Sequence, residues 1–500
     1  MRHPNSLLLA MILLVGVMVQ PAFGQTAQHR QLQALEELGI YPYPSEEEVN
    51  DSVFSSEGFV VEPLSTDDIN KNFSNIEDLS WLEPIANAHQ VILIGENHYF
   101  QYIQHLRNRI LFALNTFDTY PVLILERQYS MTPFANYYLL LKDEQEAKAF
   151  EEEFETFFMD DSDFHLFQHL RRWNKTHPDR IIQVGCSDIE HDYSLTFQQI
   201  LRPYFVSLQR ACLADAEKFP GDVERVLQEL ERIFKTKRIH SLDDLNNAFC
   251  PLEALVSVAK ERQFVGKYPF LTSLYIENVI ENLKSYYLAK TQDFSQYRQQ
   301  AIVRNLTDER FLGKAFNTGK VVIHAGAYHT PTHYPYPTGE NFLREGSYLT
   351  YECDLTKGRT YSLFLRGLAI SSAMEINDLD ENDLGGLGSG YRRIVTQIHR
   401  AAEQGLLAPE TAYAVKDSPQ PPDSPGMGEI DKLILNLCYQ YQNQPLLFQQ
   451  IPWDRLFKQA KHVSTEHYKD MVQFQEGFQG HDLHILIPTS PLVKPRKQGK

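Results

Sequence analysis

Four short apolar runs in the middle of the chain constrain its fold more than any other feature of the sequence. The runs occupy residues 91–94, 122–125, 181–184 and 321–323, and long helix-like stretches separate them. Val, Ile and Leu follow one another in these runs with hardly a polar residue between them. This pattern is typical of parallel strands that helices cover on both faces. We therefore predict an α/β fold with a mostly parallel sheet flanked by helices.

The segment after the first run has clear helical periodicity. Between His98 and Phe117, apolar residues recur at helical spacing, at Ile103, Leu106, Ile110 and Leu114. A helix is expected here, with Asn97 as its N-cap. Two shorter runs, 347–351 and 361–365, are candidates for further strands of the same sheet.

Changes in composition divide the chain into parts. Residues 1–24 form a predicted signal peptide, and 25–90 form a polar, partly helical segment. The α/β domain is expected over 91–367, with a large helical insertion at about 190–318. From 368 to 500, Gly-rich and Pro-rich stretches indicate linkers, next to a mainly helical region that ends in a basic, disordered tail.

The first 24 residues have the three-part pattern of a secretory signal. Arg2 precedes an apolar run from Leu7 to Val19, and small residues follow it, including Ala22 and Gly24. The apolar run is shorter than the ~20 residues that a membrane span needs. We expect cleavage after this stretch and export to the periplasm or the extracellular space, with no membrane span in the mature chain.

The charge balance excludes several partners. The chain has 47 Lys and Arg against 65 Asp and Glu, a net charge of −18. This argues against broad electrostatic binding to nucleic acid or to anionic membranes. Five cysteines in 500 residues are also too few for a disulfide-built scaffold. We expect a small-molecule ligand or substrate.

Acidic residues and histidines follow the apolar runs. Glu96 and His98 come after the first run, Glu126 and Arg127 after the second, Asp188 after the third, and His324 and His329 after the fourth. In open α/β sheets, ligands bind beyond the carboxyl ends of the strands. If the four strands are parallel, these side chains converge on one edge of the sheet, and they form the candidate site.

Most of these residues also have a structural interpretation. Glu96 could be a solvated loop acid, and His98 an ordinary helix residue. Glu126 ends an apolar strand, where an unpaired carboxylate is costly, so it needs Arg127 or a cation across the cleft as partner. Glu126 is then either half of a structural ion pair or a catalytic acid. His324 is either a satisfied core histidine or an active-site base.

Three further polar residues fit less central roles. Asp188 is expected to be structural or to support the site from behind, while His329 and His333 are either ligands or exposed loop residues. The sequence has no GxxxxGK[ST] phosphate loop, no GxSxG elbow and no HExxH motif. Without an obvious Ser or Cys nucleophile, the remaining chemistry is acid–base or metal-assisted, and Glu and His would perform it.

Residues 82–98, LEPIANAHQVILIGENH, resemble the opening of the erythromycin-esterase and ChaN-like superfamily. Members begin with an apolar strand that ends in a Gly-Glu-plus-His motif, followed by a helix and by a strand that ends in Glu. Here the second strand ends at Glu126, and residues 131–139 resemble the next helix. The segments 324–329 and 339–345 resemble the late histidine-containing strand end and the stretch after it.

The resemblance implies different roles in two branches. In the esterase branch it implies a hydrolytic site with a histidine as general base, formed by Glu96, His98, Glu126 and His324. In the ChaN-like branch it implies a haem-binding protein with His98 as ligand. One residue separates Glu96 from His98, as in the ChaN-like form, whereas the esterases usually have two. Ala325 stands where the esterases have Asn.

We therefore predict an exported hydrolase that uses Glu and His to activate water against an ester or amide, with no cofactor. One alternative is a haem-binding or iron-binding protein with His98 as ligand. Another is a divalent-metal-dependent hydrolase, whose ion would be held by Glu96, His98, His324 and His329. The residues expected to support the site are Arg127, Asp188 and His333.

Overall fold

The computed structural model describes most of the chain. The described residues are 30–49, 52–64, 76–154, 161–212, 222–239, 241–309, 312–332, 344–371, 389–408, 411–415, 429–478 and 480–492. The predicted signal peptide, His333, the Pro-rich segment 417–422 and the basic tail lie outside these ranges. Most of the Gly-rich stretch 378–390 lies outside them as well.

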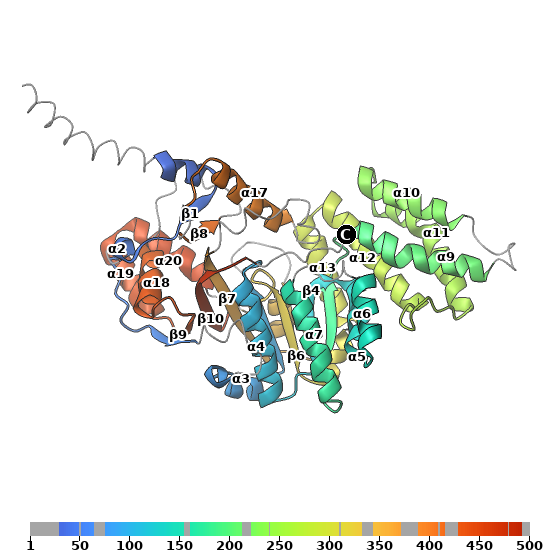
Figure 1. The fold of residues 1–500 in the computed structure, drawn as a ribbon, viewed down its shortest axis with the longest axis horizontal. Coiled ribbons are helices and arrows are strands. Elements are labelled where there is room, and N and C mark those ends of the chain that lie inside the picture. The colour runs from blue at the N-terminus through green and yellow to red at the C-terminus, as the bar shows by residue number, and fades with distance from the viewer. Residues whose placement is uncertain are drawn as a thin grey trace, which may run out of the picture.

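The described strands form one ten-stranded sheet (Figure 1). Its main path is β2 (Val60–Pro63), β9 (Leu446–Gln450), β10 (Leu483–Ser490), β7 (Thr360–Ile370), β3 (Val91–Glu96), β6 (Val321–Gly326), β4 (Val122–Gln128) and β5 (Gln183–Asp188). Neighbours from β10 to β5 pair parallel, whereas β9 and β2 are antiparallel at one edge. Beside β7 lies a small antiparallel pair, β1 (Ile40–Pro42) and β8 (Tyr413–Val415). The predicted α/β fold with a mostly parallel sheet is confirmed.

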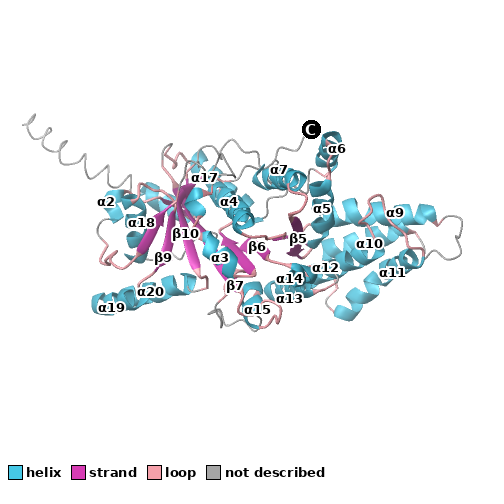
Figure 2. Ribbon diagram, turned by 90° about the horizontal axis from the view of Figure 1, so that it is seen from below, coloured by secondary structure: helices cyan, strands magenta, loops and turns pink. Residues whose placement is uncertain are grey.

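Helices cover both faces of the central strands (Figure 2). One face packs on α3 (Leu82–Ala88), α4 (Gln101–Phe117), α5 (Thr132–Leu140), α6 (Glu144–Glu153) and α7 (Asp161–Thr176). The other face packs on α13 (Phe294–Thr307), α14 (Gly313–Thr318) and α15 (Glu345–Tyr351). Along β3, Ile92 and Ile94 belong to the hydrophobic core on the first of these faces, and Val91 and Leu93 belong to the core on the second face. The strand is therefore apolar at consecutive positions, because both of its faces are buried.

The described residues between β5 and β6 are mainly helical, as expected for the insertion, and α9 to α11 extend away from the sheet in Figure 1. The elements before α13 are α8 (Tyr193–Leu195), a π-helical turn (Thr196–Leu201), α9 (Arg202–Ala211), α10 (Val223–Thr236), α11 (Leu242–Glu261) and α12 (Ser273–Thr291). Helix α13 then returns to the sheet and packs against β5. This return brings side chains from the insertion to the carboxyl ends of the strands.

The C-terminal region contributes strands as well as the expected helices. Helices α17 (Ser389–Glu403), α18 (Glu429–Gln440), α19 (Trp453–Val463) and α20 (Thr465–Phe478) alternate with β8, β9 and β10. The N-terminal helix α2 (Glu46–Val49) packs against α18. Because β10 pairs with β7 over its length, the sheet continues past the composition boundary near residue 368.

Two local predictions are wrong. Helix α4 begins at Gln101 rather than at His98, and Phe100 takes the N-cap position in place of Asn97. Residues 347–351 belong to α15 rather than to a strand, whereas 361–365 lie in β7 as predicted. No helix in the described part of the chain is long and apolar enough to cross a membrane.

Candidate active site

The carboxyl ends of four neighbouring strands carry the candidate residues. Strand β6 lies between β3 and β4, and β5 follows β4, all four in parallel register. Glu96 ends β3, Glu126 lies near the end of β4, and Asp188 ends β5. The predicted convergence of these side chains on one edge of the sheet is therefore present.

Glu96 lies between two histidines. Its Oε1 accepts a hydrogen bond from Nδ1 of His98 at 3.0 Å, and its Oε2 lies 2.8 Å from Nε2 of His324. The His98 side chain is 45% exposed, whereas those of Glu96 and His324 are 4% and 8% exposed. One buried carboxylate thus contacts an accessible imidazole on one side and a buried imidazole on the other.

The surroundings move these three pKa values in different directions. Burial alone would raise the pKa of Glu96, but His324 and His98 lower it below its ordinary value. Burial opposes protonation of His98 too, but the carboxylates of Glu96 and Glu126 outweigh it, so the pKa of His98 is raised. For His324, burial dominates, and its pKa is lowered despite the contact with Glu96.

His324 faces a buried ion-pair network on the side away from Glu96. Nη1 of Arg107 lies 3.4 Å from its Nδ1, and the same Nη1 lies 3.5 Å from Oδ1 of Asp163. Arg127 also pairs with Asp163. Arg127 therefore stabilises this network, and the partner of Glu126 comes from across the site, which was the second possibility.

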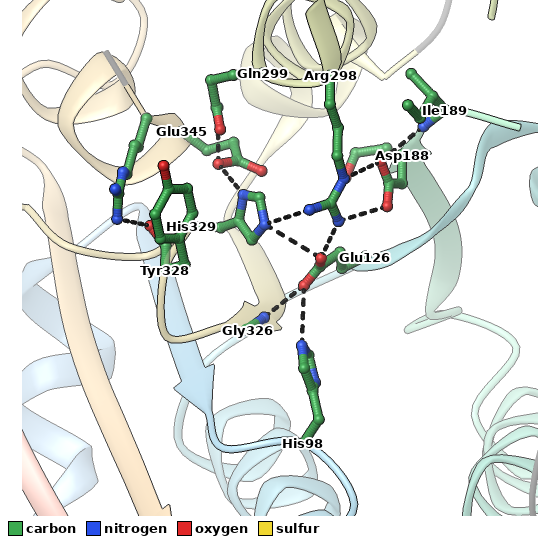
Figure 3. Close-up of polar contacts among 12 residues, drawn as sticks. His98, Glu126, Asp188, Ile189, Arg298, Gln299, Gly326, Tyr328, His329 and Glu345 are labelled. Atoms are coloured by element: carbon green, nitrogen blue, oxygen red, sulfur yellow. Dashed lines mark hydrogen bonds and ion pairs between the residues drawn. The ribbon is translucent and has the colours of Figure 1, made fainter. Parts of the chain in front are cut away.

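That partner is Arg298 of α13. It donates to Oε1 of Glu126, while Oε2 of Glu126 accepts from the backbone N–H of Gly326 at 2.5 Å (Figure 3). The Arg298 guanidinium also donates to both oxygens of Asp188, at 2.9 and 2.7 Å. Burial opposes ionisation of Glu126, but His329 and Arg298 hold its pKa well below the ordinary value.

His329 is the second histidine that contacts Glu126. Its Nε2 lies 3.2 Å from Oε1 of Glu126, and its Nδ1 lies 2.8 Å from Oε2 of Glu345 (Figure 3). Burial opposes its charge, but these two carboxylates raise the pKa of His329 to about 10. Nε2 therefore carries a proton and donates to Glu126. Nη1 of Arg298 lies 3.0 Å from the same nitrogen.

Gly326 allows His98 to approach the sheet. A Cβ at this position would lie 2.6 Å from Nε2 of His98 and 3.3 Å from Oε2 of Glu126. Nε2 itself lies 3.8 Å from that Oε2. Both imidazole nitrogens of His98 therefore face carboxylates, Nδ1 in a hydrogen bond and Nε2 at a longer distance.

Sequence reasoning missed several residues that contact the site, including Arg107, Arg298, Glu345 and His191. Arg298 lies 172 positions after Glu126, and only the need of a buried carboxylate for a cation pointed to it. No pattern in the sequence marks His191, whose Nε2 lies 2.5 Å from Oδ2 of Asp188. Asp188 was expected to support the site, and it accepts hydrogen bonds from Arg298, which in turn donates to Glu126.

The metal alternative places one ion on Glu96, His98, His324 and His329. In the part of the chain that the structure describes, no group of three His, Cys, Asp or Glu side chains is arranged to hold a metal ion. Glu96 contacts His98 and His324, whereas His329 contacts Glu126 instead.

Similar folds occur among solved structures. One is a succinoglycan biosynthesis protein, which is 12% identical, with 91% of this chain and 99% of that chain covered and a TM-score of 0.49. Another is a Bacillus cereus protein, also 12% identical, with 91% of this chain and 100% of that chain covered and a TM-score of 0.46. A mutant of the erythromycin esterase EreC in its open conformation also matches. It is 12% identical, with 87% of this chain and 99% of that chain covered and a TM-score of 0.48.

No protein-family model and no curated protein matches the sequence. The structural neighbours are too distant to assign an activity to this chain.

Proposed function

We propose that this protein is a hydrolase that activates water against an ester or amide, with His98 as the general base. The observation that carries the proposal is the accessible His98 ring, whose Nδ1 is held by the buried carboxylate of Glu96 at 3.0 Å. A carboxylate on one nitrogen fixes the tautomer and leaves the other nitrogen free to take a proton.

In the proposed reaction, Nε2 of His98 removes a proton from water as the water oxygen attacks the carbonyl carbon. The imidazolium that forms is stabilised by Glu96 at Nδ1 and by Glu126 near Nε2. His98 then returns the proton to the leaving alkoxide or amine. Because both carboxylates favour the charged ring, His98 is a stronger base than an ordinary histidine.

Glu126 is proposed to act as a fixed negative charge rather than as an acid. It accepts hydrogen bonds from Gly326 and Arg298 and contacts the protonated His329, so it has no proton to give near neutral pH. Arg298 and His329 provide positive charge beside it, where a tetrahedral intermediate would develop negative charge.

The proposal is tested with a panel of esters and amides on the purified mature chain. We expect turnover to fall by about 10²- to 10⁴-fold in His98→Ala and in Glu126→Gln, because each removes part of the general-base machinery. The matched control is His462→Ala, an exposed histidine on α19 outside the site, which should keep wild-type activity.

Turnover that is unchanged in His98→Ala would rule out His98 as the base. Native mass spectrometry after addition of haem tests the haem-binding alternative. Stoichiometric haem that is lost in His98→Ala, without turnover of any substrate in the panel, would replace the hydrolase proposal with a binding function.

We also propose that the hydrolase acts outside the cytoplasm, because residues 1–24 have the pattern of a cleaved signal peptide. N-terminal sequencing of the protein recovered from the periplasm or medium tests this. A mature chain that begins just after Gly24 is expected, and an intact Met1 on protein found only in the cytoplasm would contradict it.

A further inference from the structure

The residue that follows His98 has an unusual backbone conformation. Tyr99 has φ +77°, a value uncommon for a side chain other than glycine. Such a conformation is strained and persists only where the surrounding structure holds it. The turn that carries the proposed base is therefore held from outside.

The Tyr99 ring packs on the C-terminal region. It makes an edge contact with Tyr391 of α17, with ring centroids 5.3 Å apart and an angle of 67°. A Cβ on the preceding Gly390 would lie 3.1 Å from the Tyr99 hydroxyl. Tyr391 is fully buried in a separate hydrophobic cluster built from both ends of the chain, whose members include Leu35, Ile40, Val395, Tyr413 and Leu492.

The next residues along the chain are held by β7 and by the end of β10. The Phe100 ring lies over Gly367 of β7, where a Cβ would approach it to 2.7 Å. Phe100 forms a β-bridge with Leu492, the N–H of Gln101 donates to Pro491 O at 2.8 Å, and that of Tyr102 donates to Ser490 Oγ at 3.0 Å. Four consecutive residues after His98 thus contact segments beyond residue 360.

We propose that the C-terminal region is a clamp for the catalytic loop. Through Tyr391 and residues 490–492 it fixes the turn at Tyr99 and so keeps the His98 ring beside Glu126. Tyr99 and Tyr391 are positioning residues, since they act on the substrate only through His98. As a statement about catalysis this rests on the proposed hydrolytic function, whereas the placement of His98 can be measured without any substrate.

The first test is Tyr99→Gly. Glycine adopts a positive φ without strain, so the fold should be retained while the ring contact with Tyr391 is lost. We expect kcat to fall by about 10- to 100-fold with little change in KM, because the base is misplaced while the rest of the binding site is intact.

The second readout is the ring titration of His98, followed by NMR of histidine-labelled protein. The charged groups facing this ring are Glu96 and Glu126, which raise its pKa, and Arg127, which lowers it. In Tyr99→Gly the titration midpoint should move down toward the ordinary histidine value, because the ring moves away from the two carboxylates.

A matched pair separates positioning from general loss of stability. Tyr391→Leu and Tyr413→Leu each remove a buried tyrosine from the same cluster, so both should lower the melting temperature. Only Tyr391→Leu should also lower kcat and the His98 midpoint. If Tyr413→Leu shifts the midpoint as much, or if Tyr99→Gly changes neither readout, the clamp is wrong.

The two proposals fail in different ways. In one outcome, Tyr99→Gly shifts the His98 titration midpoint in a protein that hydrolyses no substrate of the panel. That result would support the clamp proposal and contradict the hydrolase proposal. Wild-type turnover and an unshifted midpoint in Tyr99→Gly would uphold the hydrolase and remove the clamp.

Discussion

The two sides of Glu96 place the same kind of side chain in opposite electrostatic settings. On the outer side, His98 is 45% exposed and both of its nitrogens face carboxylates. On the inner side, His324 is 8% exposed and its second nitrogen faces Arg107. The pKa of His98 is raised and that of His324 is lowered, although both rings contact one carboxylate. The chemical role of each histidine is therefore decided by its remaining neighbours and by burial.

The largest expected difference between the two sides is in activity. His98→Ala should lower kcat/KM by about 10²- to 10⁴-fold and leave the melting temperature nearly unchanged, since the ring is accessible. His324→Ala should lower activity less but destabilise the fold by about 1–3 kcal/mol, because Glu96 and Arg107 lose a buried partner. Kinetics and urea unfolding of both variants check this, and a stable, inactive His324→Ala would reverse the assignment.

The next expected effect is on the pH profile. A general base works when it is deprotonated, so kcat/KM should rise with pH through a midpoint above the ordinary histidine value. Glu96→Gln removes a charge that raises the pKa of His98, so the midpoint should move to lower pH and the plateau should fall. A profile whose midpoint stays in place in Glu96→Gln would mean that another group titrates.

A smaller effect is expected from Gly326→Ala, which tests the outer side by crowding it. The new Cβ would lie 2.6 Å from Nε2 of His98, so the ring must move away. We expect about a tenfold loss of kcat with little loss of stability. Gly319→Ala, before the same strand, is the control, because its nearest atom is Pro121 Cγ at 3.1 Å. Equal activity of the two variants would contradict the placement of His98.

The last expected effect concerns the pH dependence of stability, through His329. Its pKa rises from 6.5 to about 10 on folding, so its stabilising contribution is complete below pH 6.5 and is lost as the pH rises toward 10. The free energy of unfolding of the wild type should therefore fall across this window. Glu345→Gln removes one of the two carboxylates and should flatten the decline, and an identical slope in both proteins would contradict this origin.

Much of the site was predictable because its residues lie close to strand ends. Glu96, Glu126 and Asp188 each come at the end of a recognisable apolar run, and parallel pairing then brings them together. Arg298 was not predictable in this way, because it comes from a helix of the insertion and no local pattern marks it among other surface-forming residues. Its pairing depends on how α13 returns to the sheet.

In the fold, too, some elements are predictable from the local sequence, and others depend on contacts between distant parts of the chain. The central strands are buried on both faces, so their composition alone identifies them. Strands β9 and β10 lie far along the chain from β7, and their place in the sheet is decided by long-range pairing. The backbone at Tyr99 depends on a contact with Tyr391, 292 positions away (391 − 99), so the delayed start of α4 could not be read from local periodicity.

The central claim is that His98, and not His324, is the activated base beside Glu96. NMR titration of the wild-type protein with labelled histidine rings tests it most directly, with His98→Ala and His324→Ala used to assign the two signals. The predicted result is a His98 midpoint above 6.5 and a His324 midpoint below 6.5. A His98 midpoint at or below 6.5, or a His324 ring that protonates first, would contradict the account.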